Sequence, residues 1–179
     1  MRVDNVRGLF LNLWEPKENK NGIPTYGGCF LLPKKGNEKV IAELEKAVMD
    51  LAIENKLVNK NTGKILPSAK LPIHDGDEKM DNEGNPNELF AGCWYFNATS
   101  RKQPGIVDRN VKRIIDQAEV YSGAIYNVAI NPFFFDNESK GISFGLNNIQ
   151  KVKDGQRLGG GKSAEEEFTA LGNDEEDVW

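Results

Sequence analysis

The sequence predicts a mainly β domain, closed as a barrel or packed as a sandwich, with one principal helix. Roughly four to six segments rich in strand-forming residues are separated by Gly, Pro and Asn turns. Only one segment has the three- and four-residue apolar spacing of a convincing helix. The chain has 179 residues, 39% apolar and 28% charged, which suffices for one domain with a core plus a tail. Strand-rich chains of this size tend to close or stack their sheets.

Two strands open the chain. Residues 3–14 show no clean period but are rich in strand formers, and Pro16 is expected to end them. Residues 26–32 predict a second strand, which Pro33 stops. The two strands are therefore expected to form a hairpin with a long connection.

The principal helix is predicted at residues 37–55, with Asn37 as its N-cap. Its apolar stripe is a core face and consists of Val40, Ile41, Leu44, Ala47, Val48, Leu51 and Ala52. The polar, turn-rich residues 59–90 follow. A loop of that length inside a compact domain is usually either functional or mobile.

Strands dominate the second half. Residues 93–100 predict a strand, and residues 107–118 predict a short helix or an irregular crossing. Residues 119–131 and 141–152 predict two long strands, which FFFDNESKG joins with hairpin-turn residues. We expect one folded domain at residues 1–157 and a flexible Gly-rich hinge and acidic tail at residues 158–179.

The charge is divided unevenly along the chain. Seven of the 27 acids and none of the 23 bases lie after residue 163, so the body carries +3 and the tail −7. A basic body favours an anionic partner, and the acidic tail can compete for the same surface. The four consecutive acids of the tail, Asp174, Glu175, Glu176 and Asp177, precede an apolar tip, Val178 and Trp179.

Several function classes find little support in the residues. No window resembles a membrane span or a secretion signal. Cys29 and Cys93 are expected to be buried reduced thiols, and with the single His74 they cannot fill a zinc site. GGGKS lacks the first Gly of a phosphate-binding loop and leads into acids rather than an apolar helix. We therefore expect no cofactor, no metal and no catalysis.

The aspartates of residues 75–81 leave one enzymatic alternative open, a metal-dependent nuclease that uses Asp75, Asp77 and Asp81. EF-hand spacing fails, because Lys79 stands where an oxygen ligand is needed. A solvated acidic loop is the simpler interpretation of the same residues.

The strand at residues 93–100 carries the most informative pattern. Trp94 and Phe96 share one face, and Tyr95 and Asn97 share the other. A basic turn follows, with Arg101, Lys102, Lys112 and Arg113. Aromatic rings beside cations suit single-stranded nucleic acid, whose bases stack while the cations follow the phosphates. The simpler interpretation is a core strand followed by a solvated turn.

A second strand repeats the pattern more weakly. Tyr126 lies on one face with Val128 and Ile130, whereas Tyr121 lies on the other face. The final strand ends with the cations Lys151 and Lys153. The candidate DNA-binding residues are Trp94, Tyr95, Arg101, Lys102, Lys112, Arg113, Tyr121, Tyr126, Lys151 and Lys153.

Long stretches of the chain resemble the phage-encoded single-stranded DNA-binding proteins. The resemblance is carried by LFLNLWEPKENKNGIPTYGGCFLLPK, PIHDGDEK, FNATSRKQPGIVD, VYSGAIYNVAIN and KGISFGLNNIQKVKDGQRLGGGKSAEEEF. It implies an OB-fold, a five-stranded Greek-key barrel, here with an inserted helix, that binds single strands with little sequence preference during phage DNA replication or recombination. His74 stands where this family usually has Arg, which would weaken a phosphate contact there.

The resemblance also implies a role for the tail and a place of action. In such proteins the acids occupy the DNA groove and the apolar tip docks onto a replication partner such as a polymerase, helicase or primase. The protein would act in the cytoplasm of the infected bacterial host, away from membranes. A homodimer is left open, as is an adaptor that binds only proteins.

Overall fold

The computed structural model describes residues 1–158. Its elements are β1 (Arg2–Glu18), β2 (Pro24–Pro33), α1 (Glu38–Glu54), β3 (Ile73–Asp75), β4 (Cys93–Ser100), β5 (Gly105–Val107), β6 (Ile125–Asp136) and β7 (Lys140–Lys153), with two short 3₁₀ helices at Gly76–Glu78 and Gln117–Glu119. Apart from Leu158, the predicted hinge and tail lie outside the described residues. So do the predicted tail contacts Asp174, Glu175, Glu176, Asp177, Val178 and Trp179.

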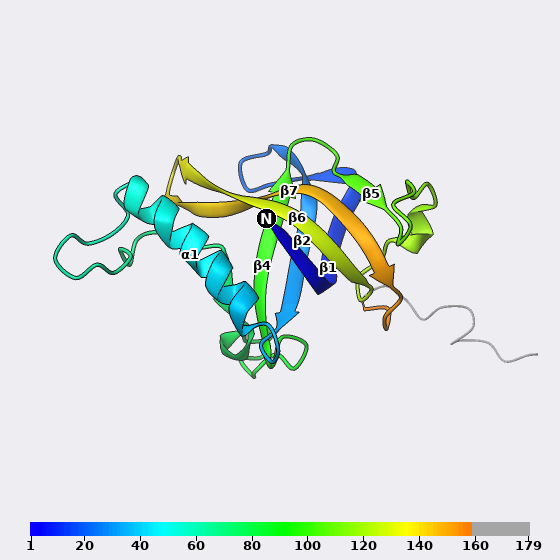
Figure 1. Ribbon diagram of the computed structural model, residues 1–179, viewed down its shortest axis with the longest axis horizontal. Coiled ribbons are helices and arrows are strands. Elements are labelled where there is room, and N and C mark those ends of the chain that lie inside the picture. The colour runs from blue at the N-terminus through cyan, green and yellow to red at the C-terminus, as the bar shows by residue number, and fades with distance from the viewer. Residues whose placement is uncertain (159–179) are drawn as a thin grey trace, which may run out of the picture.

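Five strands close a barrel in the order β1, β2, β4, β7 and β6 (Figure 1). The β4–β7 pair is parallel, and the other four neighbours around the barrel are antiparallel. This is the Greek-key barrel of an OB-fold, so the predicted fold class is confirmed. Two short strands add to it, β3 beside β4 and β5 beside β7.

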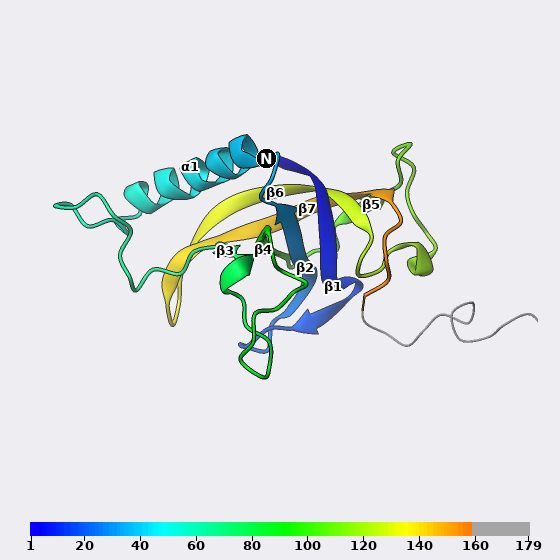
Figure 2. The same ribbon diagram turned by 90° about the horizontal axis from the view of Figure 1, so that it is seen from below.

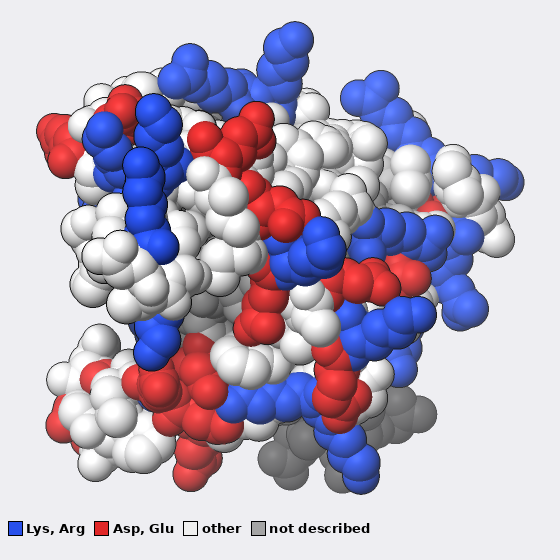
Figure 3. Space-filling view, turned by 60° about the vertical axis from the view of Figure 1, so that its left-hand side comes forward, with Lys and Arg blue, Asp and Glu red and all other residues white. Residues whose placement is uncertain are grey.

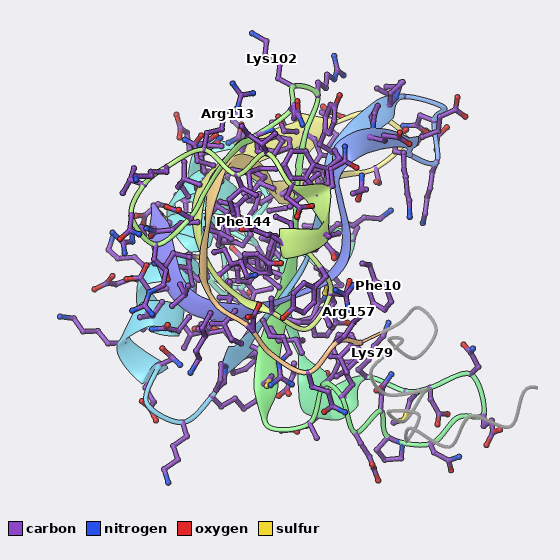
Figure 4. All side chains as sticks on the ribbon, turned by 90° about the vertical axis from the view of Figure 1, so that its right-hand side faces the viewer. Phe10, Lys79, Lys102, Arg113, Phe144 and Arg157 are labelled. Atoms are coloured by element: carbon purple, nitrogen blue, oxygen red, sulfur yellow. The ribbon has the colours of Figure 1, made fainter. Side chains whose placement is uncertain are left out.

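The barrel interior is filled by side chains from all five strands. Phe96 of β4 lies 5.7 Å from Phe30 of β2 and 5.5 Å from Phe144 of β7, measured between ring centroids. All three rings are fully buried, and Figure 4 shows Phe144 inside the barrel. Each buried aromatic of this size contributes strongly to the hydrophobic stabilisation. The strand faces that lack these rings are therefore the ones available to a ligand.

Helix α1 covers one face of an arm that β6 and β7 form beyond the barrel (Figure 2). Ile41, Leu44, Val48 and Ala52 are its buried residues, so the predicted stripe is confirmed as a core face. On the side where α1 and the arm lie, cationic and anionic residues are interspersed (Figure 3). None of the described helices is long and apolar enough to cross a membrane.

Local boundaries differ from the sequence predictions in several places, and β6 also continues to Asp136 through residues predicted as a connection. Strand β1 continues past Pro16 to Glu18, and residues 59–90, predicted as loop, contain β3. Strand β6 begins at Ile125 rather than at residue 119, because the chain first turns through the 3₁₀ helix at Gln117–Glu119. Asn37 occupies the N-cap position, but its side chain donates to the Pro33 carbonyl instead of capping the helix.

Candidate functional site

An irregularity in β1 pushes an aromatic ring into solvent. The β1–β2 register shifts between Leu9 and Asn12, and Phe10 lies in this bulge with φ +51°. A residue other than Gly or Asn rarely adopts that conformation, and where it persists the surrounding structure imposes it. The Phe10 side chain is 68% exposed. An apolar ring held in water by a strained backbone is a candidate for contact with a ligand.

The outward face of β4 meets this bulge from across β2. Phe96 and Ala98 point into the barrel, so Tyr95 and Asn97, which the alternation predicted to share a face, point outward. The Tyr95 ring stacks on His74 of β3 at 5.0 Å and meets the edge of Phe90 at 5.0 Å. These neighbours leave Tyr95 partly exposed and fixed in orientation.

The loop after β3 brings a cation over the same rings. The Lys79 ammonium lies 5.8 Å from the Tyr95 ring centroid and 5.9 Å from that of Phe90. The loop is tied down at its base, because Lys34 donates to Asp75 at 2.5 Å and to Asp77 at 2.6 Å. Hydrogen bonds from Lys34 and the Asp77 backbone lower the pKa of the Asp75 carboxyl.

These groups surround a hollow of about 470 Å³ on the outer face of β1, β2 and β4, which we call the outer-face groove. Its lining consists of Phe10, Cys29, Lys79, Met80, Asp81, Asn82, Asn87, Phe90, Tyr95 and Asn97. The groove therefore offers aromatic rings for stacking, side-chain amides for hydrogen bonding, and the ammonium group of Lys79. Phe10, His74 and Lys79 were not among the predicted DNA-binding residues, and Tyr95 is the one predicted residue that lines this groove.

The two other predicted tyrosines lie elsewhere. Tyr126 is fully buried, and its hydroxyl donates to the Tyr121 carbonyl at 2.8 Å, so no base can reach its ring. The expectation that Tyr126 stacks on DNA is therefore corrected: the ring belongs to the core, with Val128 and Ile130. Tyr121 lies below the Arg157 guanidinium at 4.3 Å and the Lys151 ammonium at 5.2 Å, and its hydroxyl donates to Asp154 at 2.8 Å.

Trp94 and Lys151 are also engaged within the protein. Trp94 packs against the main core, and the Lys34 ammonium lies 4.7 Å from its ring centroid. Lys151 pairs with Asp154 at 2.7 Å, and its side chain is only 15% exposed. Lys151 is therefore largely covered, whereas Trp94 is half-buried and lines a second hollow together with His74 and Tyr95.

The remaining predicted cations are exposed but lie apart from the groove. Lys102 and Arg113 lie in the upper part of Figure 4, above Phe10 and Lys79. The exposed cations are Arg101, Lys102, Lys112, Arg113 and Lys153. The structure thus separates an aromatic groove with Lys79 from a basic end of the barrel.

His74 stacks on the groove residue Tyr95 but does not itself line the groove. Burial against its neighbours lowers its pKa from 6.5, and the nearby Lys79 charge lowers it further. The ring is therefore neutral at pH 7 and can stack on Tyr95 without burying a charge.

The predicted thiols are both free among the described residues. Cys29 is buried at the floor of the groove, and burial raises its pKa to about 11. Such a thiol is protonated at neutral pH and behaves as a small apolar side chain.

The whole chain, residues 1–179, matches the family described as the single-stranded DNA-binding protein of Enterobacter phage Enc34. A protein of Acyrthosiphon pisum secondary endosymbiont phage 1, named p50, is 32% identical over 185 residues, which cover 99% of this chain and 96% of the relative.

Solved structures agree with this match. The single-stranded DNA-binding protein from bacteriophage Enc34 superimposes with a TM-score of 0.68 and 27% identity, over 90% of this chain and 85% of that chain. The same phage protein in complex with single-stranded DNA superimposes with a TM-score of 0.68 and 25% sequence identity, over 88% of each chain. The bacteriophage T7 protein gp2.5 superimposes with a TM-score of 0.54 and 13% sequence identity, over 86% of this chain and 91% of that chain. This similarity supports the fold alone.

Proposed function

Because this chain belongs to the family of the phage Enc34 single-stranded DNA-binding protein, we propose that it binds single-stranded DNA in the outer-face groove. The observation that carries this location is the Phe10 ring, held 68% exposed by a left-handed backbone beside Tyr95 and Lys79. Bases stack on Phe10 and Tyr95, and Lys79 follows the phosphates. Since every base has a π-face, such stacking discriminates little between sequences.

The exposed cations at the other end of the barrel extend this proposal. Arg101, Lys102, Lys112 and Arg113 would attract further phosphates of a longer strand. Lys153 would add one more contact at the end of β7. Electrostatic attraction of this kind raises affinity and association rate without reading sequence.

We place this binding in phage DNA replication or recombination, in the cytoplasm of the infected host, where it would protect single strands. Residues 1–157 act as the binding domain and residues 158–179 as hinge and tail. The tail acids compete with DNA for the cations, and Val178-Trp179 recruits a polymerase, helicase or primase. Formation of a homodimer stays a prediction.

The proposal is tested by titrating the protein with fluorescent oligo-dT at two ionic strengths. Released counterions make log Kobs fall with log[salt], with a slope of about −0.7 for each phosphate neutralised. We expect a clearly negative slope and similar affinities for oligo-dT and a mixed sequence. If the affinity for oligo-dT did not change with salt concentration, the cations would not contact the DNA phosphates.

The nuclease alternative gains no support from the geometry of its aspartates. Asp75 and Asp77 are both paired with the Lys34 ammonium, which already supplies their countercharge. The Asp81 carboxylate accepts from the backbone of Glu83 and Asn85 at 2.9 Å. The three carboxylates thus shape the loop, and the family and its solved members are named for binding rather than cleavage.

His74 gives the proposed binding a pH dependence. Its pKa is lowered in the free protein, and bound phosphates would favour its charged form, so binding would take up a proton. Affinity for oligo-dT is expected to rise as the pH falls below about 6.5, by up to about tenfold per pH unit.

The matched control for this pH effect is the His74→Gln variant, which keeps a hydrogen-bonding side chain but cannot titrate. We expect its affinity to be flat between about pH 5.5 and 7.5, since the chain has no other histidine. At pH 7 the His74→Arg variant should bind oligo-dT more tightly than both the parent chain and the His74→Gln variant. Equal pH profiles for the parent and His74→Gln would show that DNA does not approach this ring.

A further inference from the structure

A separate pocket lies beside the outer-face groove and is more enclosed by the fold. Its volume is about 340 Å³, and its lining consists of Asn5, Arg7, Leu31, Pro33, Glu88, Leu89, Ala91, Cys93 and Ile125. We call it the Arg7 pocket. Leu89 lines this pocket and the next residue, Phe90, lines the groove, so their loop separates the two hollows. Most of the wall is apolar, as is usual for sites that hold small organic groups.

Strand pairing places a cation in the middle of an apolar row on the floor of this pocket. Arg7 of β1 pairs with Leu31 of β2 on one side and with Ile125 of β6 on the other. Direct partners in a sheet share a face, so the three side chains stand together. Val6 is fully buried inside the barrel, and alternation therefore turns Arg7 to the outer face.

The loop of residues 88–92 forms the roof of the Arg7 pocket, and hydrogen bonds hold its end. The Gly92 N–H donates to the Asp77 carboxylate at 2.7 Å, and the Gly92 carbonyl accepts from the Lys34 N–H at 2.9 Å. Phe90 is 4% exposed and belongs to a small buried cluster with residues of β1 and β2. The pocket is therefore built by the fold before any ligand binds.

The Arg7 guanidinium has no partner within residues 1–158. Its side chain is half-buried, yet it takes part in none of the ion pairs there, and Arg2 is the one arginine whose side chain donates a hydrogen bond. Glu88, the one acid in the lining, is exposed and does not pair with it. Five donors in a planar fork match the oxygens of a phosphate or a carboxylate. A cation partly removed from water in this way suits an anionic ligand.

We propose that the Arg7 pocket holds one nucleotide of the bound single strand, with the base against the apolar wall and a phosphate on the Arg7 guanidinium. A nucleotide combines a flat ring with one negative charge, and the pocket offers an apolar wall with one unpaired cation. Leu31 lies two residues along β2 from Cys29 of the groove, so one DNA chain can reach both hollows.

This inference rests on the proposed function and adds a nucleotide subsite to it. Lys79 is the only cation in the lining of the outer-face groove, so Arg7 would supply a second phosphate contact on the same face. A carboxylate on an apolar side chain of a partner protein has similar chemistry. The position beside the groove, along the same strand and under the same loop, favours DNA as the occupant.

The first test is Arg7→Met, which removes the charge and keeps an apolar stem. In fluorescence titrations with oligo-dT we expect the plot of log Kobs against log[salt] to become shallower by about 0.7, the share of one phosphate. Affinity at low salt should fall about tenfold, as for loss of one charged hydrogen bond. Arg7→Lys keeps the charge without the fork, and should bind more weakly than the parent with the parent slope.

The matched control is Arg2→Met, in the same strand. Arg2 pairs with Asp4 and lies outside the lining of the Arg7 pocket. This variant should keep both the affinity and the salt slope of the parent chain. Thermal unfolding checks that all three variants stay folded.

Cys93 reports on the Arg7 pocket in the unaltered chain. Its free thiol is half-buried in the lining, where burial raises its pKa and the Arg7 charge partly offsets that rise. Alkylation by iodoacetamide, followed by mass spectrometry of the Cys93 peptide, should slow when oligo-dT saturates the protein. The protection should be smaller in Arg7→Met.

The outcomes separate this subsite from the groove. A parent chain that does not bind oligo-dT would overturn both proposals. If the parent binds but Arg7→Met keeps the parent slope, the phosphate contact at Arg7 is wrong and the groove stands. If Cys93 reacts equally fast with and without oligo-dT, the pocket is empty in the complex, and a carboxylate of a partner protein replaces DNA as its occupant.

Discussion

Replacing Phe10 by glycine is expected to weaken oligo-dT binding by about 1–3 kcal/mol, or roughly 5- to 150-fold in Kd, without loss of stability. The ring is the most exposed aromatic of the outer-face groove and contributes little to the core. Glycine adopts φ +51° freely, so the strain that phenylalanine stores at this bulge is released. The released strain offsets the greater flexibility that glycine gives the unfolded chain, to within about 1 kcal/mol.

The control for Phe10→Gly is Phe133→Ala, on the β6–β7 arm, where the aromatic is 39% exposed and lies outside the groove lining. We expect it to bind oligo-dT like the parent. Thermal unfolding checks that both variants stay folded, and a fluorescence titration gives Kd. A Phe10→Gly variant that binds with parental affinity would mean that DNA passes elsewhere on the barrel.

Phe10 illustrates what the sequence could not predict. Residues 3–14 lacked a clean period because two residues, Asn5 and Phe10, adopt positive φ in irregular stretches of β1. Each irregularity shifts the inward-facing set by one residue, so alternation cannot assign faces there. The run Leu9-Phe10-Leu11, three apolar residues without alternation, was the available signal. In regular β4, by contrast, alternation correctly put Phe96 and Tyr95 on opposite faces, and the structure shows that Phe96 is the buried one.

The helix and the tyrosines show that local sequence patterns were predictable, whereas contacts between distant segments were not. Helix α1 was predictable because its stripe depends on residues three and four apart in sequence. Tyr126 shares its strand face with Val128 and Ile130, and that apolar alternation already favoured the core. The pairing of β3 with β4 brings Lys79 to the groove and His74 onto the Tyr95 ring. The turn-rich sequence of residues 59–90 gives no sign of this long-range contact.

A chain truncated after Ser163 is expected to bind oligo-dT more tightly than the intact chain, by about tenfold at low salt. Truncation removes seven acids and no base, and it leaves the barrel strands intact, since β7 ends at Lys153. A tethered competitor at millimolar effective concentration with a local Kd of about 0.1 mM would lower the apparent affinity by that factor. The measurement is the same fluorescence titration on both chains.

Two controls, high salt and neutralised tail acids, distinguish electrostatic competition by the tail from an effect of chain length. Screening at about 1 M ionic strength should bring the two affinities together, because the Debye length falls to about 3 Å. A full-length chain with its last four acids changed to amides, Asp174→Asn, Glu175→Gln, Glu176→Gln and Asp177→Asn, should bind nearly as tightly as the truncated chain. Intact and truncated chains with equal affinity at low salt would leave the tail no role in DNA binding. Recruitment of a partner by Trp179 would then be its only proposed task.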